Sequence, residues 1–142
     1  GKVFVEAVDR MDRREGNGWI LNFLRRADYD NCIVDGAVGR QVLEQDMLNA
    51  KLRAPMMMTT GEAIAAFSMF ETAITNDGIV HMGQPAVERS VTNVDHRAIG
   101  TSGGFGFRAI KEGVDVTIME AVAIAYWLAA TSKPKRKQRV TY

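Results

Sequence analysis

The sequence predicts an α/β protein with a mixed sheet flanked by helices and a β-hairpin before the C-terminal helix. Short apolar runs alternate along the chain with segments whose apolar residues recur at helical spacing. The length of 142 residues, 46% of them hydrophobic, fits one domain with one core. We therefore expect a folded domain over residues 1–132 and a disordered basic tail over residues 133–142.

The first part of the chain shows two strand patterns and two helix patterns. Residues 3–8 are apolar on both alternating faces apart from Glu6, which is typical of a strand. A polar connection leads to a helix from Gly18 to about Ala27, where apolar residues recur at helical spacing. A buried strand then ends at Asp35, and a second amphipathic helix follows with the apolar residues Val38, Val42, Leu43 and Met47.

The middle of the chain adds a strand, a helix and a further short strand. Residues 55–58 predict the strand. The Thr-x-x-Glu pattern at Thr59 and Glu62 is a capping box and predicts the start of the helix. We expect that helix to end at residues 76–78 and a short strand to follow at residues 79–81.

A hairpin and a final helix complete the predicted domain. Residues 84–91 suit a helix or a turn. Two short β segments within residues 95–107 flank a Gly-Gly turn, as in a hairpin. The last helix is expected over residues 118–130, and Thr117 with Glu120 repeats the capping-box pattern at its start.

Asp35 is the strongest indication of chemistry, because it ends the apolar run of residues 32–34 and precedes a turn at Gly36. Such a run predicts a central strand of a mostly parallel sheet. Ligands gather at the carboxyl ends of the strands in sheets of this kind. The structural alternative is that Asp35 caps a helix starting near Ala37, since Asp is a favoured N-cap residue.

Two more carboxylates, Asp115 and Glu120, could join Asp35 in a metal site. Two-metal phosphoryl hydrolysis needs several carboxylates from different elements, because the ions clamp both the attacking and the leaving oxygen. Asp115 precedes the last helix and Glu120 lies in its predicted first turn. The alternatives are an exposed loop acid for Asp115 and a capping-box acid for Glu120.

The two histidines are weaker candidates. His81 lies between a short strand and Met82-Gly83, where an imidazole could act as a base, contact phosphate or bind a metal. No second histidine lies nearby at ligand spacing, which favours a hydrogen-bonded structural role. His96, within the predicted hairpin, is a still weaker candidate.

Several other kinds of site do not fit the sequence. The glycine-rich residues 100–106 match neither a P-loop nor a dinucleotide fingerprint. The lone Cys32 excludes an internal disulfide and a cysteine-based zinc site, and it is a poor nucleophile within a strand. The single cysteine favours a reducing, intracellular setting. No apolar stretch approaches the length that spans a bilayer, which favours a soluble protein.

Charge is distributed unevenly along the chain. The net charge is +1, and removing the five basic residues of the tail leaves the remainder at −4. The tail therefore suits either an anionic partner such as nucleic acid or a solubilising role. Its basic residues are Lys133, Lys135, Arg136, Lys137 and Arg139.

Five segments of the chain, in order, resemble the C-terminal nuclease domain of the large terminase subunit of tailed bacteriophages. They are VFVEAVDRMDRREGNGWILNFL, CIVDG, ITNDGIVHMGQPAVERSVTNV, the hairpin with GGFGF, and DVTIMEAVAIAYWLA. The resemblance runs across nearly the whole chain up to the tail, and it depends on order and spacing, since no single motif is diagnostic.

This resemblance implies a ribonuclease H-like fold that cuts concatemeric viral DNA with Mg²⁺ or Mn²⁺. Asp35 matches the carboxylate on the family's central strand, and Asp115, or Glu120 in its place, matches the acid at the last helix. His81 matches a histidine to which no role is assigned. The family's first catalytic aspartate, on a strand expected before Val3, is not matched, so this chain is expected to be part of a longer protein and weakly active or inactive alone.

The resemblance also implies partners and a location. The expected partners are double-stranded DNA and, in the full-length protein, an ATPase domain, the portal protein and the small terminase subunit, in the cytoplasm of a bacterial host. The alternatives are a non-catalytic docking or DNA-binding module of the packaging motor, and another ribonuclease H-like enzyme such as a transposase or resolvase.

Overall fold

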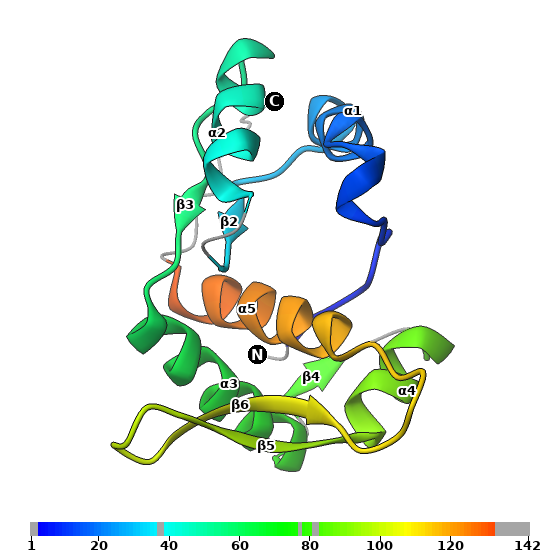
Figure 1. The fold of residues 1–142 in the computed structure, drawn as a ribbon, viewed down its shortest axis with the longest axis vertical. Coiled ribbons are helices and arrows are strands. Elements are labelled where there is room, and N and C mark those ends of the chain that lie inside the picture. Colours follow the sequence, from blue (N-terminus) through cyan, green and yellow to red (C-terminus); the bar gives the residue numbers. More distant parts are fainter. Residues whose placement is uncertain (1–2, 37–38, 77, 81–82, 133–142) are drawn as a thin grey trace, which may run out of the picture.

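The computed structural model describes residues 3–36, 39–76, 78–80 and 83–132, and these form a mixed α/β structure (Figure 1). Helices and short strands alternate as the sequence predicts. In chain order the elements are β1 (Val3–Phe4), η1 (Arg13–Glu15), α1 (Gly18–Arg26), β2 (Ile33–Val34), α2 (Arg40–Asn49), β3 (Met56–Met57), α3 (Thr60–Thr75), β4 (Ile79–Val80), α4 (Pro85–Thr92), β5 (Val94–Ile99), β6 (Gly104–Ala109) and α5 (Val116–Thr131).

The strands form three separate pairs within the described residues, whereas the sequence predicted one sheet. β1 pairs in parallel with β4, β2 pairs in parallel with β3, and β5 and β6 form the predicted antiparallel hairpin. The parallel strands are only two residues long, so each pair has few backbone hydrogen bonds and does not extend into a continuous ladder. Cys32 lies just before β2 and is half-buried.

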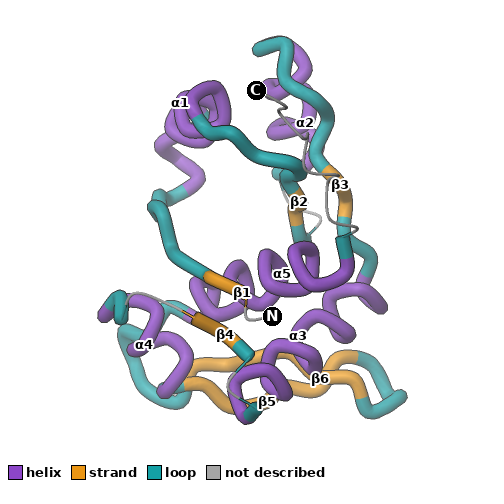
Figure 2. Tube along the Cα trace, turned by 180° about the vertical axis from the view of Figure 1, so that it is seen from behind, coloured by secondary structure: helices purple, strands orange, loops and turns teal. Residues whose placement is uncertain are grey.

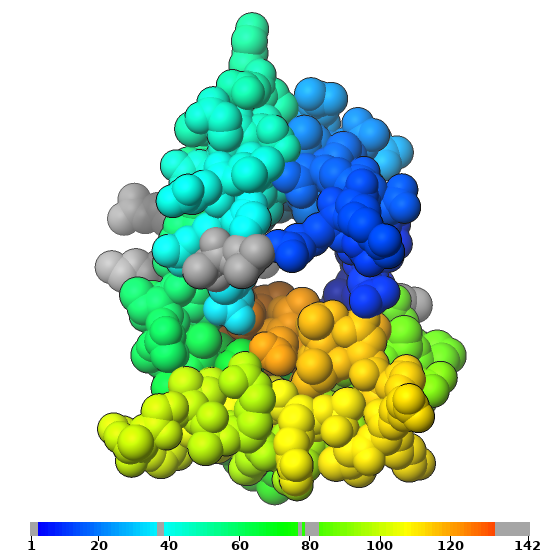
Figure 3. All heavy atoms as spheres, in the orientation of Figure 1, coloured from blue at the N-terminus to red at the C-terminus, as the bar shows by residue number. Residues whose placement is uncertain are grey.

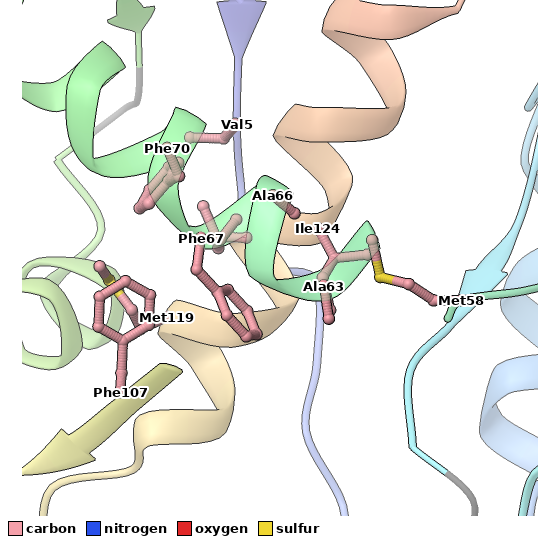
Figure 4. Packing of buried hydrophobic residues seen from close by; sticks show 11 residues of the cluster. Val5, Met58, Ala63, Ala66, Phe67, Phe70, Phe107, Met119 and Ile124 are labelled. Atoms are coloured by element: carbon pink, nitrogen blue, oxygen red, sulfur yellow. The ribbon is translucent and has the colours of Figure 1, made fainter. Parts of the chain in front are cut away.

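Helix α5 lies at the centre of the fold. It packs against α3, α4 and β6 on one side and against β1 and β2 on the other (Figures 1 and 2). The core gathers where α3, α5 and the hairpin meet, and Phe67 contacts Phe107 there edge-on, with ring centroids 5.3 Å apart (Figure 4). The buried core cluster consists of Val5, Met58, Ala63, Ala66, Phe67, Phe70, Phe107, Met119, Val122, Ala123 and Ile124.

The two predicted capping boxes have different outcomes. At α3 the prediction is confirmed, because Glu62 N donates to Thr59 Oγ1 at 3.1 Å and Thr59 N donates to a Glu62 carboxylate oxygen at 3.0 Å. At α5 it is wrong, because the N-cap is Asp115, whose Oδ1 accepts from Thr117 N at 3.0 Å. Glu120 therefore lies one turn into the helix, and its side chain has no capping role.

The interpretation of Asp35 as a helix cap is also wrong. Helix α2 begins at Arg40, and its N-cap is Gly39, whose φ of 82° lies in the left-handed region. Asp35 is therefore too far along the chain to satisfy the first N–H groups of that helix. The Asp35 carboxylate therefore does not cap α2.

The side chain of Ser90, on α4, forms hydrogen bonds with residues at the start of α5. Its side chain is 1% exposed, and its hydroxyl donates to the Asp115 carbonyl at 2.7 Å and accepts from Met119 N at 3.0 Å. One buried hydroxyl thus holds α4 to the first turn of α5.

Among the described residues, no helix is long and apolar enough to cross a membrane.

Candidate active site

A cleft of about 960 Å³ lies between the end of β2 and the outward face of α5. Its polar lining residues are Asp30, Asn31, Asp35, Arg53, Thr117, Glu120 and Ser132. Figure 3 shows the hollow, with α5 in orange as its floor and the cyan region around β2 above it. Two of the three predicted metal-binding acids therefore share one cleft, although they are far apart in the sequence.

Asp35 reaches the cleft from the turn that follows β2. Its side chain is exposed, and its Oδ1 accepts a hydrogen bond from Gly36 N at 2.7 Å. Gly36 has a φ of 84°, a conformation that glycine adopts at little cost, so the chain turns away directly after the acid. Among the residues that the structure describes, none donates to Oδ2 of Asp35, which is open to a ligand within the cleft.

Glu120 faces Asp35 from α5 and is partly buried. Burial raises the pKa of Glu120 above its ordinary value of 4.5, the guanidinium of Arg97 opposes that rise, and the carboxylate of Asp35 adds to it. A partly buried carboxyl whose pKa is raised beside a second carboxylate is a common arrangement at cation sites and catalytic sites.

We expect the substitution Glu120→Gln to stabilise the metal-free protein at neutral pH. A raised pKa means that the folded state binds the proton more tightly than the unfolded state, so stability is lost as pH rises from about 4.5 through the raised pKa. In EDTA, the melting temperature of Glu120→Gln should exceed that of the wild type at pH 7, and the two should converge near pH 4.

Glu62 provides a control of opposite sign for this measurement. Hydrogen bonds from Thr59 lower the pKa of Glu62, so its ionised form supports folding and its contribution is lost as pH falls. Glu62→Gln should therefore be less stable than the wild type at pH 7. An equal response of both variants to pH would contradict the assigned environment of Glu120.

Asp115 is held apart from the other two acids. Its Oδ1 accepts from Thr117 N and from Thr117 Oγ1 at the start of α5. Its Oδ2 is buried, accepts no hydrogen bond among the described residues, and forms an ion pair with Arg10. Asp115 lines neither the cleft of Asp35 nor a second cleft of about 570 Å³ on the β1 side of α5.

The histidines and the tail contribute no described contact to the cleft. His96 Nε2 lies 2.5 Å from Glu71 Oε2, and its ring stacks on Phe105 with centroids 3.8 Å apart, which holds the hairpin to α3. This geometry fits the structural role favoured by the sequence. The remaining candidates, His81, Lys133, Lys135, Arg136, Lys137 and Arg139, lie outside the described residues.

Two residues of the cleft were missed by sequence reasoning. Arg53 donates a hydrogen bond from Nη2 to the Asp30 carbonyl at 2.7 Å and brings a positive charge to the cleft wall. Thr117 exposes its side chain beside Glu120. Arg53 could not be predicted because its place depends on a contact with the distant Asp30, whereas the local pattern at Thr117 indicated only a helix cap.

The donor set of Asp35 and Glu120 suits a hard divalent cation that keeps part of its water. No group of three or more acidic, histidine or cysteine side chains that could hold a metal ion occurs among the described residues. Mg²⁺ needs no such cage, since it commonly binds through one or two carboxylates together with water and substrate phosphates.

A scan of family models, a search of curated proteins and a search of solved structures each found no match to the chain. The chemistry of the site is therefore inferred from its own residues and from the resemblance of its segments.

Proposed function

We propose that the chain is a metal-dependent DNA endonuclease domain with a ribonuclease H-like fold, of the kind found in phage terminases. The observation that carries this proposal is the meeting of Asp35 and Glu120, from a strand end and a central helix, in one open cleft. The ordered segments that resemble the terminase nuclease support the same assignment.

In this proposal Asp35 and Glu120 hold Mg²⁺ or Mn²⁺ at the cleft. A bound ion would polarise the phosphodiester and activate a water molecule. The residues that would hold it are fixed by the chain: Gly36 N donates to one Asp35 oxygen, and the packed helix α5 sets the position of Glu120. The openness of the cleft gives an extended phosphate backbone access to both carboxylates.

The resemblance expects a further aspartate on an additional strand, and a space over α5 is compatible with one. The clefts beside β1 and β2 share three lining residues with short side chains, Thr117, Ala121 and Ala125.

A non-catalytic docking or DNA-binding module is the competing proposal. It is favoured by the ion pair between Arg10 and Asp115, which engages one of the expected acids outside the cleft. The two proposals differ in metal binding, since a docking module has no need of a cation at Asp35.

Manganese should raise the melting temperature of the wild-type protein. A ligand that binds only the native state, at a hundredfold excess over its dissociation constant, stabilises by about 2.7 kcal/mol, or about 5–10 °C for a chain of this size. Asp35→Asn should lose most of this shift. Asp28→Asn, an exposed acid outside the cleft lining, should keep it. No shift in the wild type would favour the docking module.

A further inference from the structure

Arg53 lies in the same cleft as the proposed cation ligands. It is an exposed residue between α2 and β3, and it lines the cleft together with Asp35 and Glu120. Among the described residues of the lining it is the one that carries a positive charge, and the other charged residues are the acids Asp30, Asp35 and Glu120. A phosphate group that enters the cleft would therefore meet one cationic side chain of the described chain.

The pairing of β2 with β3 places Arg53 at one end of the cleft wall. The two strands lie side by side in parallel, with Ile33 opposite Met56 (Figures 1 and 2). Three residues earlier on each chain segment, the same register sets Asp30 opposite Arg53, and Arg53 Nη2 donates to the Asp30 carbonyl at 2.7 Å. Asp35 follows the other end of β2. Five extended residues span at most about 17 Å, which limits the distance between the Cα atoms of Asp30 and Asp35.

The hydrogen bond to Asp30 orients the Arg53 side chain without neutralising its charge. The acceptor is an uncharged backbone carbonyl, and Arg53 forms no ion pair within the described part of the chain. Arg10, Arg14 and Arg108 differ in this respect, since each is paired with a carboxylate. Nη2 is held by this bond, and a guanidinium has further N–H donors that can bind an anion. A guanidinium already held in place loses less conformational freedom on binding a phosphate than a free surface arginine does.

We propose that Arg53 binds a phosphate of the DNA backbone at the end of the cleft away from Asp35 and Glu120 and so holds the strand along the cleft. This inference rests on the proposed nuclease function. One phosphate would lie at the two acids and their cation, and a second phosphate at the guanidinium. A separation of about 17 Å corresponds to about five nucleotides along one strand of duplex DNA, at about 3.4 Å each. Phosphate contacts of this kind fix the position of a nucleic acid without reading its sequence.

Binding of a fluorescein-labelled DNA duplex, followed by anisotropy in EDTA at several salt concentrations, tests this inference. Arg53→Gln should weaken binding about tenfold and reduce the slope of log affinity against log salt by about one, because one phosphate contact is lost. Arg53→Lys should keep the salt slope of the wild type and bind with intermediate affinity, because it keeps the charge and loses the paired donors.

Arg26→Gln is the matched control. Arg26 is exposed on α1, its Nε donates to the Asn22 carbonyl at 3.2 Å, and it lies outside the cleft lining. The control thus removes the same charge and the same kind of hydrogen bond. Its affinity should stay within about twofold of the wild type, because the lost arginine contacts no phosphate of the bound strand. Both arginines are exposed, so the melting temperature should change little and report intact folding.

Equal affinity and equal salt slope for Arg53→Gln and the wild type would overturn this inference, as would a loss of the same size in Arg26→Gln. A salt slope in Arg53→Lys as low as that of Arg53→Gln would also overturn it, and so would absence of any DNA binding by the wild type. Because no divalent ion is present, the outcome is separate from that of the proposed function, which fails on the manganese response of Asp35→Asn.

Discussion

Asp35→Asn should lower manganese-dependent cleavage of supercoiled plasmid by at least about a hundredfold. Loss of a residue that merely supports a metal ligand commonly costs tenfold to a hundredfold, so loss of a charged ligand should cost no less. The replacement is nearly isosteric, and the amide oxygen can still accept the hydrogen bond from Gly36 N. The Asp35→Asn protein should therefore still fold, and its lower cleavage rate should result from the loss of the charged metal ligand.

Asp28→Asn serves as the matched control, because Asp28 is exposed and lies outside the cleft lining. Equal nicking rates for Asp35→Asn and Asp28→Asn would show that Asp35 has no role in the cleavage reaction.

Phe67→Ala should cost about 3–5 kcal/mol of unfolding free energy, the largest effect expected of a single core substitution. The Phe67 side chain is 1% exposed and packs edge-on against Phe107, which joins α3 to the hairpin. A domain of this kind has only about 5–15 kcal/mol of stability in total, so the loss is large. The midpoint of urea unfolding measures it.

Phe23→Ala is the control for that measurement. Phe23 is 39% exposed on α1 and lies outside the buried core cluster, so its removal should cost much less. Similar losses in the two variants would contradict the assignment of the core to the contact between α3, α5 and the hairpin.

Elements that depend on neighbouring residues were predictable from the sequence. Helix α3 follows from the capping box at Thr59, and the hairpin follows from two β segments around a glycine turn. Both signals are local, because the hydrogen bonds that they describe join residues only a few positions apart.

The rest could not be predicted, because it depends on competition and on distant contacts. Thr117 and Asp115 are both residue types that cap helices. Because Asp115 is the N-cap of α5, Glu120 lies beyond the first turn of the helix, where it lines the cleft. The pairing of Arg10 with Asp115 joins segments that no local pattern connects. The pairing of β1 with β4 and of β2 with β3 also joins segments that are far apart in the sequence.

We propose that Asp35 and Glu120 form a divalent cation site in the cleft over α5. Titration calorimetry with MnCl₂ on the wild type and on the double variant Asp35→Asn/Glu120→Gln measures binding at this site. The wild type and the Asp28→Asn control should give a saturable binding isotherm, and the double variant should not. Identical isotherms for the wild type and the double variant would show that these two acids do not bind the ion.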